Sequence, residues 1–139
     1  MNTAYRVWDG GKMHYWDDKY LSLVIEGGVC WTLWRYGNKG YLVAHYADDK
    51  CAFMQGTDQF QTSGKLKRIY ARDIVQQEET APGGLYDPEP FIGEVKMIDG
   101  LWCIVNEKKG ECRPLFFETA TNKVIGDVYQ NPELLEGAE

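Results

Sequence analysis

The sequence has few of the residues from which metal centres and disulfide frameworks are built. Its 139 residues include two histidines and four cysteines, and no pair of cysteines has C-x-x-C spacing. Structural zinc sites need such closely spaced ligands, so we expect no metal and no other cofactor. We expect the cysteines to be free thiols in a reducing compartment. They are Cys30, Cys51, Cys103 and Cys112.

Long apolar runs and a positive net charge are also missing. No run approaches the roughly 20 apolar residues that cross a bilayer, and residues 1–10 lack the apolar core of a signal peptide. These absences lead us to expect a cytoplasmic protein without a membrane partner. The net charge of −6 and the pI of about 4.9 disfavour nucleic acid as a partner, unless basic residues gather locally.

Aromatic residues and glycines are abundant, which favours a protein of many short strands. Aromatics make up 14% of the chain, and there are 15 glycines. Residues 5–16 are predicted to form a hairpin with its turn at Gly10 and Gly11, which places Trp8 opposite Met13. Residues 20–26, 29–36 and 41–46 continue the antiparallel meander.

The second half of the chain has the layout of an SH3-type barrel. Asp99-Gly100 is a preferred type I′ hairpin turn, and a Pro- and Gly-rich loop over 76–90 precedes it. The predicted strands are 73–77, 91–98, 101–106, 111–118 and 123–129, followed by a helical turn over 131–136. In the hairpin over 91–106, alternation predicts that the face carrying Val95, Met97, Trp102 and Ile104 belongs to the core. We therefore predict an all-β protein in which an N-terminal antiparallel β meander, residues 1–60, packs on a C-terminal SH3-like small β-barrel, residues 61–139.

The closing stretch 123–135 carries several local signals. Gly126 lies inside a predicted strand, where glycine often marks a bulge or a close backbone approach. Asn131 is a good N-cap for a helix that Pro132 would begin. Leu134 and Leu135 are expected to fold back as an apolar plug.

Three parts of the chain carry a family resemblance. The first is Tyr5–Asp9, followed by Lys12 and Met13. The second consists of Met54, Gln55 and Thr57, followed by Ile69, Tyr70 and residues 73–75. The third, residues 126–135, is the most specific. Together they resemble the YopX proteins of bacteriophages and prophages. The resemblance implies an SH3-like barrel and a phage or prophage origin. The cytoplasm expected above would then be that of a bacterial host cell. The resemblance implies no established activity and no catalytic residues.

The sequence departs from the family pattern at two places. Arg72 stands where the family usually has glycine before the aspartate. The family's Thr-Gly-Leu is Thr57-Asp58-Gln59 in this chain. The Trp-rich region 29–46 has no counterpart in the resemblance.

The sequence contains two weak catalytic patterns. Glu94 and Lys96 with an upstream Asp73 or Asp87 form the skeleton of a Mg²⁺-dependent nuclease, in which the carboxylates hold the metal. Glu-x-Lys is also common on exposed strands, and the flanking helices of such nucleases are not predicted. We therefore expect surface charges and no enzyme. His14 and His45 are expected at ordinary strand positions, because no local motif pairs either with a cysteine.

A basic cluster offers an alternative function. It combines four cations with one tyrosine, and cations beside an aromatic ring on a small barrel can bind single-stranded nucleic acid. The simpler interpretation is a charged loop that leads into a strand. The residues are Lys65, Lys67, Arg68, Tyr70 and Arg72.

The region 29–46 is aromatic on both predicted strand faces. A strand pair that is apolar on both faces is often covered by its own chain or by a partner. Both alternatives stay open for this face. The function we predict is a non-enzymatic protein-interaction module, one that forms a homo-oligomer or binds another protein. The predicted contact residues are Trp31, Trp34, Tyr36 and Tyr41, with the loop over 78–90 as a second choice.

Overall fold

The computed structural model describes residues 3–36, 40–62, 64–79 and 90–136. Within this part of the chain every element is a strand except one four-residue helix, so the predicted all-β fold is confirmed. The chain divides into two compact units, Met1–Gln55 and Gly56–Glu139, called unit 1 and unit 2 below. None of the helices in the described ranges is long and apolar enough to span a membrane.

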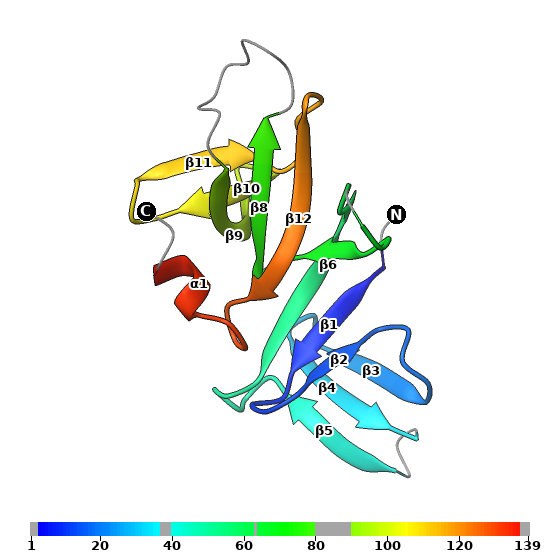
Figure 1. Ribbon diagram of the computed structural model, residues 1–139. Helices are drawn as coiled ribbons and strands as arrows, with labels where there is room; N and C mark the ends of the chain where they lie inside the picture. Colours follow the sequence, from blue (N-terminus) through cyan, green and yellow to red (C-terminus); the bar gives the residue numbers. More distant parts are fainter. Residues whose placement is uncertain (1–2, 37–39, 63, 80–89, 137–139) are drawn as a thin grey trace. The chain divides into compact units, whose positions relative to one another are not determined.

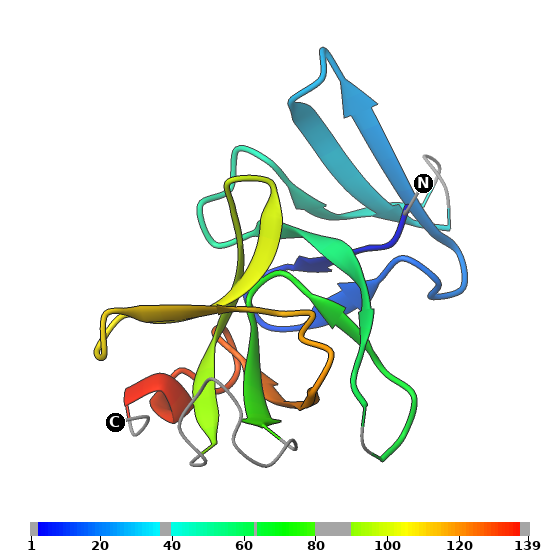
Figure 2. The same cartoon turned by 90° about the horizontal axis from the view of Figure 1, so that it is seen from above.

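Unit 1 contains two groups of antiparallel strands (Figure 1). In the first, β1 (Tyr5–Trp8) lies between β2 (Met13–Tyr15) and the start of β6 (Ala52–Phe60). In the second, β4 (Cys30–Arg35) lies between β3 (Leu21–Glu26) and β5 (Tyr41–His45). Figure 2 shows the hairpin of β3 and β4 projecting from the rest of this unit.

The first hairpin has the predicted register. Trp8 lies opposite Met13, and the side chain of Asp9 closes the turn by accepting hydrogen bonds from the backbone nitrogens of Gly11 and Lys12. Gly10 has a positive φ of 103°, which an L side chain rarely adopts. The glycine pair therefore supplies the turn, and Asp9 fixes it.

One apolar cluster joins the two strand groups of unit 1. Val7 from β1, Leu33 from β4 and Ala44 from β5 are fully or almost fully buried in it. Alternation along β4 places Trp31 and Arg35 on the same face as Leu33, and Trp34 on the opposite face. This alternation decides which aromatic residues of β4 belong to the core.

Unit 2 has the strand order of an SH3-type barrel, as predicted. Its five-stranded sheet has the order β11-β10-β9-β8-β12 (Figure 1). Consecutive strands from β8 to β11 are therefore neighbours in a meander, and the last strand, β12, pairs with β8. The strands are β8 (Asp73–Glu79), β9 (Phe91–Ile98), β10 (Leu101–Asn106), β11 (Glu111–Pro114) and β12 (Ala120–Asp127). The short strand β7 (Arg68–Tyr70) pairs with the end of β6.

The core of unit 2 forms on one face of the β9–β10 hairpin. Val95 and Ile104 are fully buried, and Trp102 packs against the same cluster. Met97 lies opposite Trp102 on this face, yet 48% of it is exposed. The expectation that Met97 is a core residue is therefore wrong, because it lies next to the turn at the end of the hairpin.

The loop expected from residue 76 begins later. β8 continues to Glu79 because Glu78 and Glu79 still pair with Thr121 and Ala120 of β12. Residues 80–89, including Asp87, lie outside the described residues. The interaction loop expected over 78–90 therefore falls almost entirely outside them as well.

The closing stretch confirms the prediction for Gly126 and corrects the one for Asn131. The pairing of β12 shifts between Val124 and Gly126, and a Cβ on Gly126 would lie 2.6 Å from the side-chain oxygen of Asn131. That oxygen accepts a hydrogen bond from the backbone nitrogen of Asp127, so it turns back and does not cap the helix. Helix α1 spans Glu133–Glu136, and the leucines within it are half-buried.

Candidate functional site

Three exposed tyrosines form a continuous row at one end of the β3–β4 hairpin. Tyr20, Tyr36 and Tyr41 are 67%, 60% and 55% exposed. The rings of Tyr20 and Tyr36 are stacked with centroids 5.1 Å apart, and the rings of Tyr36 and Tyr41 are 6.2 Å apart. We call these three residues the tyrosine cluster.

Two of the four non-glycine residues that have a positive φ in the described part of the chain lie at the same place. Tyr20 has a φ of 63° and Tyr36 a φ of 67°, in the left-handed region that bulky side chains rarely adopt. Each such residue costs about 1 kcal/mol or more. The backbone nitrogen of Tyr36 donates to the carbonyl of Tyr20 over 2.7 Å, which holds the two strained residues together. Strain of this kind points to a site where the side chains are used.

An open groove with cationic side chains lies beside the cluster. Tyr20 and Tyr36 line it together with Lys12, Lys19 and Arg35. Residues 1–55 hold six Lys or Arg against six Asp or Glu, and residues 56–139 hold nine against fifteen. Residues 1–55 are therefore neutral overall, and residues 56–139 carry all of the net charge of −6. The groove lies in the neutral part of the chain.

A buried histidine anchors the wall of this groove. The Nε2 of His14 lies 2.7 Å from the Oδ2 of Asp9, and its Nδ1 lies 3.0 Å from a terminal nitrogen of Arg35. The guanidinium of Arg35 also donates to the carbonyl of Lys19 over 3.0 Å and lies 3.8 Å from the carboxylate of Asp18. The sequence had suggested only an ordinary strand position for His14.

The carboxylate of Asp9 is stabilised in its charged form. Burial raises the pKa of Asp9, but hydrogen bonds from His14 and from the backbone of Gly11 and Lys12 outweigh it, so the pKa lies below its ordinary value. Asp9 therefore offers His14 an ionised acceptor at neutral pH.

The four predicted contact aromatics separate into two groups. Tyr36 and Tyr41 belong to the exposed cluster. Trp31 packs against the unit 1 core and its ring lies 6.0 Å from that of Phe53. Trp34 is half-buried on the opposite face of β4, where its indole nitrogen donates to the hydroxyl of Thr32. Tyr20 was not among the predicted contact residues. The sequence placed it at the start of a strand over 20–26, whereas it precedes β3 in a left-handed backbone conformation.

The five residues of the predicted basic cluster do not share one open surface. Arg68 donates to the carbonyl of Thr57 over 2.7 Å and its guanidinium lies 4.7 Å from the ring centroid of Phe60. Tyr70 is only 6% exposed, so its ring is not available for stacking on a base. Lys65 and Lys67 are exposed.

The fifth member of that cluster, Arg72, pairs with Glu94. Its guanidinium donates to Oε2 of Glu94 over 2.6 Å, and the ammonium of Lys96 lies 3.9 Å from the other carboxylate oxygen. Lys96 also bonds Glu107 at 3.0 Å. Both oxygens of Glu94 thus face cations, which leaves the carboxylate poorly suited to hold Mg²⁺.

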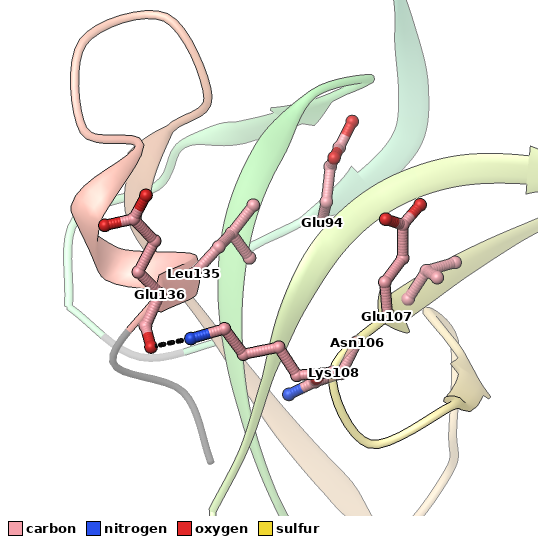
Figure 3. Close-up of a pocket in the computed structure, with 7 residues that line it drawn as sticks. Glu94, Asn106, Glu107, Lys108, Leu135 and Glu136 are labelled. Atoms are coloured by element: carbon pink, nitrogen blue, oxygen red, sulfur yellow. Dashed lines mark hydrogen bonds between the residues drawn. The ribbon is translucent and has the colours of Figure 1, made fainter.

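Glu94 and Glu107 also line a cavity of about 190 Å³ beside helix α1. Figure 3 shows the side chain of Leu135 pointing away from the helix as part of the cavity lining, with Lys108 hydrogen-bonded to the carbonyl of Glu136. Asp73, the other proposed metal ligand, accepts a hydrogen bond from the backbone nitrogen of Tyr70. The described part of the chain contains no group of three or more His, Cys, Asp or Glu that could hold a metal ion.

The cysteines are free thiols in the structure. Cys51 and Cys103 have pKa values above the ordinary range, with burial as the main cause. A raised pKa leaves less thiolate at neutral pH, so these two cysteines are poor nucleophiles.

These observations define the class: a two-unit all-β protein in which one unit has the strand order of an SH3-type barrel and the other exposes an aromatic cluster. The model of the family described as "YopX protein" matches residues 4–136. The SPbeta prophage-derived uncharacterized protein YopX of Bacillus subtilis (strain 168) is 42% identical over 145 residues, covering 100% of both chains. The chain therefore belongs to the YopX family.

A solved structure supports the same assignment. The X-ray crystal structure of protein yopX from Bacillus subtilis matches with a TM-score of 0.74 at 42% sequence identity, covering 96% of this chain and 98% of that one. The resemblance read from the three sequence stretches is confirmed, and so is the all-β fold it implied.

Proposed function

We propose that this protein is a non-enzymatic interaction protein of phage or prophage origin that associates with a second copy of itself through the tyrosine cluster. The origin is supported by the relative that is named as prophage-derived. The mode of action is supported by one observation above the others: three tyrosine rings remain exposed in a row, and two of them, Tyr20 and Tyr36, stand on a strained backbone. Tyrosine is among the residues that contribute most to protein interfaces.

Charges around the cluster favour contact between identical surfaces. Lys12 and Lys19 are exposed beside it, and Asp17 and Asp18 lie in the same connection between β2 and β3. Across a two-fold axis, the lysines of one copy can face the aspartates of the other. Because the surface around the tyrosine cluster carries both lysines and aspartates, it can be complementary in charge to the same surface of a second copy.

The test is the molar mass of the full chain by light scattering across a dilution series. The double variant Tyr20→Asn/Tyr36→Asn removes two rings, and asparagine tolerates the left-handed backbone, so the fold is retained. We expect its dissociation constant to rise about tenfold or more, the effect of losing an interface hot spot.

Val29→Thr is the matched control. Val29 is an exposed apolar residue at the opposite end of the β3–β4 hairpin, and its replacement should leave the dissociation constant unchanged. A wild-type chain that stays monomeric at every concentration would sink the proposal. So would an oligomer that Tyr20→Asn/Tyr36→Asn leaves intact.

A further inference from the structure

We propose that His14 controls the tyrosine cluster by taking up a proton: neutral His14 holds Arg35 in place, and protonated His14 releases it. The inference rests on the self-association proposed above, since it concerns the same surface. Its starting point is the pair of contacts at the buried imidazole, to Asp9 on one side and to Arg35 on the other.

The partners of His14 fix its protonation state. A guanidinium has only donors, so the Nδ1 of His14, 3.0 Å from Arg35, must be an acceptor without a proton. The Nε2 then carries the proton and donates it to Asp9 over 2.7 Å. His14 is therefore the neutral Nε2–H tautomer, and only this form satisfies both contacts.

A second proton on His14 would break one of the two contacts. The proton would bind Nδ1 and point at the N–H groups of Arg35, so two donors and two positive charges would face each other. Asp9, from the turn between β1 and β2, would keep its bond to the imidazolium. On β1 the residue opposite His14 is the uncharged Val7. Arg35 is therefore the group that must move, toward Asp18 at 3.8 Å or into solvent.

Movement of Arg35 reaches the tyrosine cluster by two routes. Arg35 directly precedes Tyr36 in the chain. Its guanidinium also holds the carbonyl of Lys19, the residue before Tyr20. The backbone of both tyrosines is strained, and one backbone hydrogen bond of 2.7 Å joins them. Few interactions therefore hold their stacked geometry once Arg35 has moved away.

The experiment tests the variant His14→Gln and uses His45→Gln, at the other histidine of the chain, as its control. Self-association of the full chain is measured between about pH 8 and about pH 5, the range in which histidine changes charge. We expect the dissociation constant of the wild type and of His45→Gln to rise about fivefold or more as the pH falls. His14→Gln, which cannot take up a proton, should show no such rise. A pH dependence that survives His14→Gln and disappears in His45→Gln would overturn the proposal.

A second measurement on the unmodified chain separates this inference from self-association. The ¹⁵N signals of the His14 ring at high pH should report the Nε2–H tautomer. The ring signals of Tyr20 and Tyr36 should shift along the same titration curve as His14. If the chain is monomeric but these signals move together, the proton control stands and self-association falls. If His14 titrates while both tyrosine signals stay fixed, the proton control is wrong.

Discussion

The guanidinium of Arg72 and the carboxylate of Glu94 lie 2.6 Å apart, although Arg72 occupies a backbone conformation that favours glycine. Its φ is 72°. The backbone is held from both sides: the nitrogen of Arg72 donates to Val95 over 3.0 Å, and its carbonyl accepts from Val128 over 3.1 Å. Arg72 therefore makes a left-handed turn that glycine would make without strain, and the ion pair with Glu94 offsets part of that strain.

This relationship predicts how substitutions of Arg72 should rank. Arg72→Ala loses the ion pair and keeps the strain. Arg72→Gly loses the ion pair but relieves the strain, and should be about 1 kcal/mol more stable than Arg72→Ala. Urea unfolding of the two variants measures the difference. Equal stabilities would show that the positive φ carries no cost.

Among the glycines that the structure describes in unit 2, Gly93 is predicted to tolerate substitution least. A Cβ there would lie 2.7 Å from a methyl carbon of Ile104 and 2.7 Å from the carbonyl oxygen of Val105. Backbone cannot yield as a side chain can, so Gly93→Ala should destabilise by about 3 kcal/mol, toward the upper end of overpacking costs. The measurement is the midpoint of denaturant unfolding.

Gly126→Ala is the matched comparison for Gly93→Ala. The three atoms nearest to the added methyl would all belong to the side chain of Asn131. Its cost should be smaller, and Asn131→Gly in the same chain should recover part of it. A larger loss for Gly126→Ala than for Gly93→Ala would contradict this ranking.

The hydroxyl of Thr57 is predicted to contribute more to the stability of the fold than its methyl group. Thr57 is fully buried, donates to the carbonyl of Ile69 over 2.6 Å and accepts from the backbone nitrogen of Gln59 over 3.0 Å. Thr57→Val keeps the shape but leaves both groups unsatisfied, and should cost about 1–3 kcal/mol. Thr57→Ser keeps both bonds and should cost less, about 1 kcal/mol for the lost methyl. Thermal unfolding of both variants tests the order.

Ionised Asp9 is predicted to stabilise the folded chain, and this stabilisation is predicted to be lost at acidic pH. Its pKa is lower in the folded chain than in the unfolded chain, so the folded state favours the ionised form. The stabilisation is fully present above the unfolded pKa and is lost as the pH falls through the folded pKa. The Tm of the wild type should therefore drop below about pH 4 more steeply than that of Asp9→Asn. Parallel curves would contradict the assignment.

The sequence predicted much of the fold because local signals and global arrangement agreed. Gly10-Gly11 and Asp99-Gly100 are turn pairs that set the register of their hairpins, and both hairpins form as predicted. The prediction for Gly126 was correct because a glycine inside a strand commonly permits a bulge or a close approach. The prediction for Met97 was wrong because alternation gives the face of a residue but not its distance from the end of the strand.

The candidate site was only half predictable. Aromatic richness pointed to Tyr36 and Tyr41. Alternation assigned the aromatic residues to two faces, but it could not show that the face with Trp31 is the one that joins the core. Tyr20 reaches the cluster through a left-handed backbone that no propensity predicts. His14 and Arg35 are 21 residues apart and meet only through packing of two strand groups. Contacts of that kind are invisible to periodicity.

Strand β6 has a consequence for any attempt to express the two units separately. Its first four residues pair with β1 and its later residues pair with β7, so both units draw on the same nine-residue strand. A cut at the boundary after Gln55 would end one fragment at the last β1-pairing residue and open the other at Gly56, one residue before Thr57. Two soluble halves therefore require overlapping gene fragments, each encoding the whole of 52–60.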